Sequence, residues 1–141
     1  MIISFTTSPT RIHKFKPMLD SLLNQTERPE LILLNIPRQF RRTGETYDIP
    51  EYVLNNVTVN VAEEDYGPAT KIIPTIKHLK EHQYPGDTRI IYLDDDIFYQ
   101  DKMVETIYKL ADDKNIYTAT GFHIIENNIM GIRGNLANAT I

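Results

Sequence analysis

Three consecutive aspartates, Asp94 to Asp96, stand directly after the apolar run Ile-Ile-Tyr-Leu at 90–93. Neighbouring carboxylates repel one another, and a cation held close to them offsets that repulsion. Hard divalent ions such as Mg²⁺ and Mn²⁺ take carboxylate oxygens as ligands and are often shared with substrate phosphates. The motif therefore indicates a divalent-metal site for a phosphate-bearing ligand. A solvated acidic turn that caps the following helix is the alternative.

The spacing of these aspartates suggests which of them bind the metal and which contact the ligand. Asp94 and Asp96 are two residues apart, so on an extended chain their side chains point the same way. We expect them to share one ion, or one of them to bind the metal while the other meets a ligand hydroxyl or a bound water. Asp95 is expected to point elsewhere, towards another part of the ligand or into a turn.

A second informative stretch is the segment 65–71, Asp-Tyr-Gly-Pro-Ala-Thr-Lys. Its Gly-Pro pair predicts a tight turn, after which Thr70 is expected to cap a helix that carries Lys71 and Pro74 in its opening turn. The macrodipole disfavours a lysine at a helix N-terminus, whereas the same end attracts anions. We therefore expect Lys71 to serve an anionic ligand, and an exposed surface lysine is the alternative.

Two further polar segments carry arginines. The turn 6–11, Thr-Thr-Ser-Pro-Thr-Arg, offers hydroxyls and backbone amides that could hold an anion or a base edge. Arg11 has the forked donor geometry that suits phosphate, although a plain polar strand-to-helix turn is an equally open interpretation. The loop 38–48 contains Arg38, Arg41 and Arg42. We interpret it as a solvated basic loop, with a phosphate-facing role as the sharper alternative.

The elements that must position these residues follow from the apolar periodicity. Strands are expected at 1–6, 31–36, 57–62 and 90–93, and helices at 13–25, 49–55, 70–83 and 101–112. The strands 31–36 and 90–93 are expected to be buried, and Pro50 is expected at the first helical position of its helix. A further strand at 115–120 and a hairpin of 122–125 with 129–133 about Asn127-Asn128 are expected next, with no element in the tail from Gly134.

Strands thus alternate with helices at least three times, which favours an α/β fold with a mostly parallel sheet and right-handed crossovers. Three polar segments then follow the carboxyl ends of strands and should meet at one edge of the sheet: the turn 6–11, the segment 65–71 and the aspartates 94–96. Residues 78–82 match the zinc-protease pattern H-x-x-E-H, but the match lies just before the segment Tyr84-Pro85-Gly86. We attribute its histidines to the last turn of a helix, where the dipole favours them.

Bulk composition excludes several classes of function. With no cysteine, disulfides, thiolate zinc sites and cysteine nucleophiles are absent. A net charge of −4 gives no electrostatic case for nucleic acid or anionic membranes. No run approaches the roughly 20 apolar residues of a membrane span, and the N-terminus does not resemble a signal peptide. We expect a single domain over 1–141 in the cytoplasm.

Taken in order, the three polar segments resemble the nucleotide-sugar glycosyltransferases of the GT-A fold. These enzymes carry D-x-D after an apolar strand, and one group combines D-x-G-P-x-x-K with D-D-D, as 65–71 and 94–96 do here. The turn 6–11 is similar to their first nucleotide-binding turn. The chain also resembles the enzymes with which chloroviruses glycosylate capsid protein, which would place it in the host cytoplasm. The likeness extends from the N-terminus to about Phe98.

The resemblance implies a Rossmann-like, mostly parallel sheet with flanking helices and a metal-dependent hexosyl transfer from a nucleoside diphosphate sugar, a UDP-sugar, to a glycan or glycoprotein acceptor. Asp96 and Asp94 would hold Mn²⁺ or Mg²⁺, and Asp94 or Asp95 would meet the ribose or the sugar. The other donor-binding residues would be Thr6, Thr7, Arg11, Asp65 and Lys71. The leaving diphosphate develops negative charge, which a divalent ion and a lysine stabilise.

One departure from that family concerns length. Such folds continue well past D-x-D into an acceptor-binding half that supplies any catalytic base, whereas only residues 97–141 follow here. We therefore expect a chain truncated at its C-terminus, in which donor binding can survive without turnover, and we assign no catalytic base.

Two alternatives from other classes stay open. Phosphohydrolases of the haloacid dehalogenase type also place D-x-D after a strand, with the first aspartate as nucleophile. Their motif normally follows the first strand and continues with Thr or Val, whereas here it follows about the fourth and continues with Ile97. The second alternative is a metal- or nucleotide-binding module without catalysis.

Overall fold

The computed structural model describes residues 1–112, 115–125 and 128–140. The chain divides into two units, Met1–Val104 and Glu105–Ile141. The first unit contains the three polar segments singled out above, so it is the unit that matters for the site.

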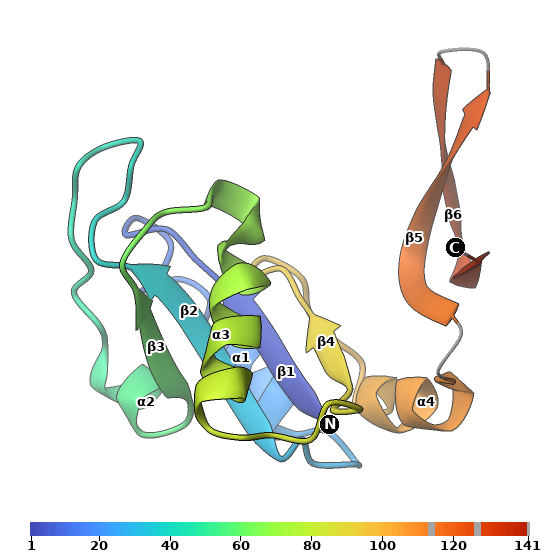
Figure 1. Cartoon of the computed structure of the whole chain (residues 1–141), viewed down its shortest axis with the longest axis horizontal. Helices are drawn as coiled ribbons and strands as arrows, with labels where there is room; N and C mark the ends of the chain where they lie inside the picture. Colours follow the sequence, from blue (N-terminus) through green and yellow to red (C-terminus); the bar gives the residue numbers. More distant parts are fainter. Residues whose placement is uncertain (113–114, 126–127, 141) are drawn as a thin grey trace. The chain divides into compact units, whose positions relative to one another are not determined.

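A four-stranded sheet forms the centre of the first unit (Figure 1). Its strands are β1 (Ile2–Thr6), β2 (Leu31–Pro37), β3 (Thr58–Ala62) and β4 (Ile90–Tyr92), arranged in the order β3-β2-β1-β4. Every pairing in it is parallel. The predicted α/β fold with a parallel sheet is therefore confirmed.

Helices flank this sheet. They are α1 (Lys16–Leu23), α2 (Glu51–Leu54), the 3₁₀ helix η1 (Gly67–Lys71) and α3 (Ile73–Glu81). A further helix, α4 (Met103–Leu110), spans the boundary between the two units. In Figure 1, α3 lies in front of the sheet and α1 behind it. The central strand β1 is accordingly buried on both faces, with Ile2, Ile3 and Phe5 fully inside. Burial of this kind is what makes short strands of apolar residues stable in a parallel sheet.

Proline positions account for two differences from the predicted helices. Helix α1 begins at Lys16 rather than at 13, because Pro17 is tolerated only in an opening turn and disfavours helical geometry before it. Residues 9–14 form turns instead, with the Lys14 amide donating to the Arg11 carbonyl at 2.7 Å. Pro50 is the N-cap of α2, with extended backbone, rather than its first helical residue.

The predicted helix start at Thr70 is wrong. Residues 67–71 form η1, and α3 begins only at Ile73 with Ile72 as its N-cap. The Thr70 hydroxyl accepts a hydrogen bond from the Tyr66 amide at 3.1 Å, so it caps the 3₁₀ turn. Lys71 is the last residue of η1, and the argument that its position opposes an α-helix dipole does not apply. Pro74 does lie in the opening turn of α3, as predicted.

Burial of the strands also differs in two places. β2 is buried on both faces as expected, but it includes a polar residue, Asn35, which is 0% exposed. β4 is the edge strand of the described sheet, and Tyr92 in it is 37% exposed. The apolar run could not reveal this exposure, because it does not indicate that the strand lies at the edge of the sheet.

The second unit contains an antiparallel pair, β5 (Asn115–Ile125) and β6 (Asn128–Thr140). The predicted hairpin is present, although its turn residue Asn127 lies outside the described residues. The separate strand 115–120 and the tail without an element are wrong, because each strand runs on through a glycine. Cross-strand pairing such as Gly121 with Ile132 sustains the ladder at these positions. Among the described residues, no helix has both the length and the apolar character that a membrane crossing requires.

Candidate functional site

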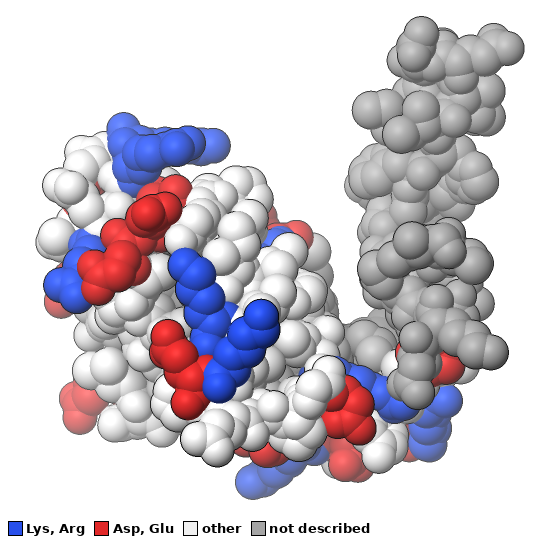
Figure 2. Space-filling model, in the orientation of Figure 1, with Lys and Arg blue, Asp and Glu red and all other residues white. Residues whose placement is uncertain are grey.

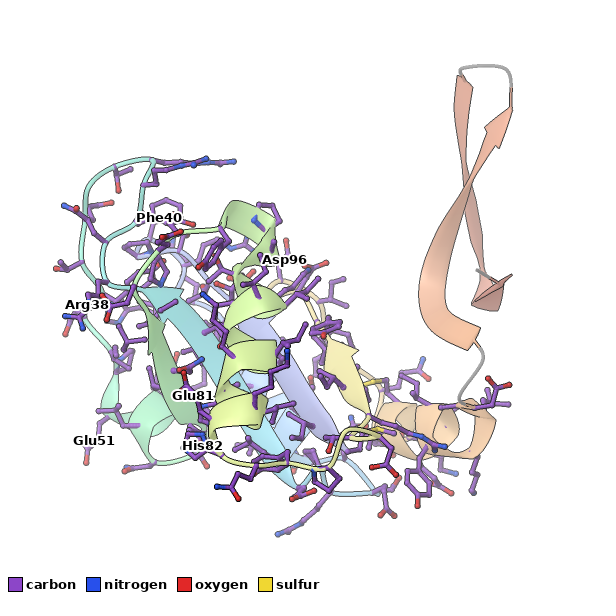
Figure 3. The ribbon with its side chains drawn as sticks, in the orientation of Figure 1. Arg38, Phe40, Glu51, Glu81, His82 and Asp96 are labelled. Atoms are coloured by element: carbon purple, nitrogen blue, oxygen red, sulfur yellow. The ribbon has the colours of Figure 1, made fainter. Side chains whose placement is uncertain are left out.

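The three polar segments meet at the carboxyl edge of the sheet, around a cavity of about 440 Å³. All seven residues predicted to bind a nucleotide sugar line it: Thr6, Thr7, Arg11, Asp65, Lys71, Asp94 and Asp95. Asp96 lies beside them through its ion pair with Arg11. Figure 3 shows Asp96 and Phe40 at this end of the sheet, and Glu81 and His82 of the H-x-x-E-H match at the other end of α3.

Asp95 is the fixed member of the acidic triplet. Its side chain is 8% exposed. The Thr7 hydroxyl donates to Asp95 Oδ2 at 2.5 Å, and the Arg11 guanidinium lies 2.5 Å from Oδ1. Both carboxylate oxygens thus have a strong partner, which a buried charge requires. This contact joins the first turn of the chain to the aspartates.

The two flanking aspartates are exposed and each contacts one protein cation. Asp96, 62% exposed, lies 2.9 Å from the same Arg11 guanidinium. Asp94, 58% exposed, lies 2.5 Å from Lys71 Nζ. The repulsion within the triplet is therefore offset in this structure by Arg11 and Lys71.

The triplet is not extended, contrary to the geometry assumed for its spacing. β4 ends at Tyr92, and Asp95 and Asp96 lie in a turn. As a result, neighbours Asp95 and Asp96 share one partner, Arg11, whereas Asp94 has its own. Three polar turn-forming residues in a row end the strand earlier than the apolar run alone suggests.

Tyr99 holds the triplet in place through its hydroxyl. The Asp94 amide donates to this hydroxyl at 3.0 Å, and the hydroxyl in turn donates to the Asp94 carbonyl at 3.1 Å. Burial raises the pKa of Tyr99 to about 12; the backbone hydrogen bond to Asp94 acts in the opposite direction, and the charges of the three aspartates add to the rise. The phenol therefore stays protonated and able to donate at neutral pH.

Asp65 binds protein groups with both carboxylate oxygens. Oδ1 accepts a hydrogen bond from the Gly67 amide at 2.7 Å, and Oδ2 accepts one from the Arg41 amide at 2.8 Å. It thereby joins η1 to the loop 38–48. Gly67 itself has a φ of +59°, a conformation that glycine adopts without steric strain.

The loop 38–48 forms a wall of the cavity, which the favoured interpretation as a solvated loop did not foresee. Its lining residues are Phe40, Arg41, Arg42 and Tyr47. The Tyr47 hydroxyl donates to the Thr7 carbonyl at 3.0 Å, and burial, followed by Asp65 and Asp95, raises its pKa. Figure 2 shows basic side chains gathered at the upper edge of the first unit, over this loop. In the sequence, the cluster of arginines was the only sign that this loop lines the cavity.

A buried polar network beneath the cavity was also missed. Asn35 Nδ2 donates to the Ser4 and Thr75 hydroxyls at 2.9 Å each, and Asn60 Nδ2 donates to Asn35 Oδ1 at 2.7 Å. The Ser4 hydroxyl donates to the Lys71 carbonyl at 2.6 Å. The network ties the backbone of Lys71 to the sheet, and so fixes where its side chain enters the cavity.

The donor set fits a hard divalent ion. No cluster of three or more metal-ligating side chains occurs in the described part of the chain. Mg²⁺ and Mn²⁺ need only one or two carboxylates, however, when phosphate oxygens and waters complete the shell. Asp94 and Asp96 supply two exposed carboxylates next to a cavity with basic walls, which meets that requirement.

A larger cavity of about 610 Å³ lies elsewhere, at the amino ends of β2 and β3. Among the described residues that line it, Arg28 and Glu30 are the ionisable ones. Size alone would favour it, but it gathers no group of side chains able to bind metal or phosphate. We therefore take the smaller cavity as the functional site. No family model, curated protein or solved structure matches the chain.

Proposed function

We propose that this chain binds a nucleoside diphosphate sugar, a UDP-sugar, and belongs to a metal-dependent glycosyltransferase that acts on a glycan or glycoprotein acceptor. The observation that carries the proposal is the meeting of Arg11 and Lys71 with Asp94 and Asp95 in one cavity at the carboxyl edge of a parallel sheet, with Asp96 paired to Arg11 beside it. In open α/β sheets this edge is where ligands bind. The cytoplasmic location expected from the sequence stays a prediction.

The chemistry of sugar transfer from such a donor is supported by the charges present. Breaking the bond between sugar and diphosphate leaves negative charge on the phosphates, and fixed cations stabilise it. Arg11 and Lys71 supply that charge, while Asp96 and Asp94 would hold a divalent ion. When bound, the ion acts as a Lewis acid towards the diphosphate.

The remaining lining residues suit the nucleoside and the sugar. Thr6 and Thr7 line the cavity beside Arg11. The Thr7 hydroxyl already donates to Asp95 at 2.5 Å, so its lone pairs are the part left for a ligand donor. Phe40 and Tyr47 offer aromatic surface on the opposite loop. We assign no catalytic base, since no lining side chain is singled out as one by its contacts.

The test is calorimetric titration of the protein with UDP and several UDP-sugars, with and without Mn²⁺. We expect Mn²⁺-dependent binding that Asp96→Ala reduces at least tenfold, since a metal-ligand carboxylate is lost. Asp87→Ala, which removes an exposed aspartate in a distant turn, is the matched control and should bind like the wild type.

Three outcomes would contradict the proposal. If neither Mn²⁺ nor the Asp96→Ala substitution affects UDP binding, no metal takes part in that binding. Absence of UDP binding together with an aspartyl-phosphate trapped on Asp94 would assign the site to phosphoryl transfer instead. If a longer chain supplied with acceptors binds the UDP-sugar but transfers no sugar, the protein is a binding module without catalysis.

A further inference from the structure

The acidic triplet contains two kinds of ion pair. Asp95 is buried and is held by both Thr7 and Arg11. Asp94 and Asp96 are more than half exposed, and each contacts a single cation. Removing a partner from a buried charge is strongly unfavourable, whereas an exposed pair contributes little and exchanges readily. The Asp95 contact is therefore permanent, and the contacts of Asp94 and Asp96 are replaceable.

Arg11 takes part in both kinds of contact. Its guanidinium lies 2.5 Å from Asp95 and 2.9 Å from Asp96. When Asp96 finds another cation, the Asp95 contact still keeps Arg11 in the cavity. Lys71 is held differently, because the Ser4 hydroxyl fixes its backbone carbonyl while its ammonium group reaches Asp94. Both cations thus remain at the site after losing the exposed carboxylate.

We propose that Arg11 and Lys71 are built-in counter-ions of Asp96 and Asp94, exchanged when a divalent metal and a diphosphate bind together. The carboxylates pass to the metal, and the released cations pass to the phosphates. The inference rests on the proposed function in one respect, namely that the anion is a nucleoside diphosphate. It adds that neither the metal alone nor the anion alone compensates all the charges of the site.

The consequence is positive coupling between the two ligands. A metal that binds alone leaves Lys71 without its carboxylate and Arg11 with Asp95 alone, in a cavity that Arg41 and Arg42 also line. An anion that binds alone meets the aspartates. Bound together, each ligand offsets the charge that the other leaves uncompensated, and the coupling is the same in both directions.

The test measures binding of Mn²⁺ alone, by electron paramagnetic resonance of the free ion, to the wild type, Arg11→Gln and Lys71→Gln. Each variant removes a competing cation, so we expect Mn²⁺ alone to bind roughly threefold to fivefold more tightly, the equivalent of one exposed ion pair. Affinity for UDP at saturating Mn²⁺ should fall in the same variants. Opposite signs for the two ligands are the signature of exchange.

Arg38→Gln is the matched control. Arg38 is an exposed arginine paired with Glu63 at 2.6 Å, and its removal makes the same change in net charge outside the cavity. Mn²⁺ affinity in this variant should stay within about twofold of the wild type, because salt screens distant exposed charges. If Arg38→Gln matches the cavity variants, general electrostatics explain the gain and the exchange is refuted.

Unchanged or weaker Mn²⁺ binding in Lys71→Gln overturns the inference, since the lysine would then support the metal. Lys71→Gln decides the matter if Arg11→Gln fails to fold after losing the buried Asp95 contact. Failure of the proposed function would give a different result, because the wild type would then bind no UDP at any Mn²⁺ concentration. The measurements with Mn²⁺ alone would still report whether the aspartates exchange their cations.

Discussion

The Tyr99 hydroxyl is the residue-scale feature on which the position of the aspartates depends. It makes two hydrogen bonds to the backbone of Asp94, at 3.0 and 3.1 Å. Tyr99→Phe keeps the ring and removes both bonds, so we expect a loss of about 1–3 kcal/mol in the free energy of unfolding. Urea denaturation measures that loss, and calorimetry should show weaker UDP binding at saturating Mn²⁺.

Tyr92→Phe provides the control for this variant. Tyr92 is half-exposed on the edge strand, and its hydroxyl has no hydrogen-bond partner among the described residues. Its removal should leave both stability and UDP affinity within error of the wild type. Equal losses in the two variants would mean that the Tyr99 hydroxyl does not hold the triplet.

A pH dependence follows from the same tyrosine. Its pKa in the folded protein is raised to about 12, above the ordinary value of 10.0, chiefly by burial. The unfolded chain therefore loses the phenolic proton first, and the stability that the neutral phenol contributes is present below pH 10 and lost between pH 10 and 12. In urea denaturation, the advantage of wild type over Tyr99→Phe should shrink across this interval. A constant difference would contradict the prediction.

Residue types predicted the acidic and basic members of the site but not the tyrosines. Asp94, Lys71 and Arg11 stand beside strand ends in the sequence, and parallel strands bring such positions together. Tyr47 donates one hydrogen bond to the carbonyl of Thr7, 40 residues away, and Tyr99 makes two hydrogen bonds to the backbone of Asp94. Neither composition nor periodicity records a contact of that kind, so the three-dimensional arrangement was needed to find it.

At the scale of elements, the buried network around Asn35 decides how η1 and α3 sit on the sheet. Asn35→Leu removes the acceptor of Asn60 and the donor to Ser4 and Thr75. Leaving buried polar groups without partners costs about 1–3 kcal/mol, and we expect a loss of this size in the free energy of unfolding. Chemical denaturation provides the measurement.

A double-mutant cycle distinguishes this network from simple loss of packing. Asn60→Leu alone should also destabilise the protein, because it leaves Asn35 Oδ1 unpaired. The double variant should lose less than the sum of the two single variants, since the same hydrogen bond is removed in each. Additive losses would show that the two asparagines act independently.

The loop 38–48 supports a prediction about anion binding. Arg41 and Arg42 line the cavity, and among the described residues neither guanidinium has an ion-pair partner. Arg41→Gln with Arg42→Gln should weaken UDP binding several-fold at low salt, and the difference should shrink as salt screens the charges. Calorimetry at two ionic strengths measures this, with Arg38→Gln as the control. A salt-independent loss would indicate an effect on loop structure instead.

Element boundaries were predicted less well than element types. Every strand of the sheet and every longer helix was expected from apolar periodicity, because a core-facing stripe is a sequence-local property. The start of α3 was misplaced since Gly67 and Pro68 open a 3₁₀ turn that Asp65 and Thr70 cap together. The burial of Asn35 depends on three partners from other elements, which no local pattern specifies.

At the scale of the whole molecule, the site and the core occupy one unit. The described lining residues of the cavity lie within Met1–Val104, as does every buried apolar side chain among residues 1–112, the part of the chain for which burial is described. The end of this unit is fastened through Val104, whose amide donates to Gln25 Oε1 at 2.9 Å. A unit with its own core and a secured end is expected to fold by itself.

A chain of residues 1–112, which retains all of α4, tests this independence. We expect a single cooperative unfolding transition and a UDP affinity at saturating Mn²⁺ within about twofold of the full chain, because no lining residue is removed. Thermal unfolding followed by circular dichroism and calorimetric titration provide the two measurements. Loss of cooperativity would show that β5 and β6 are needed for folding. Cooperative unfolding with lost UDP binding would instead assign the second unit a part in the ligand site.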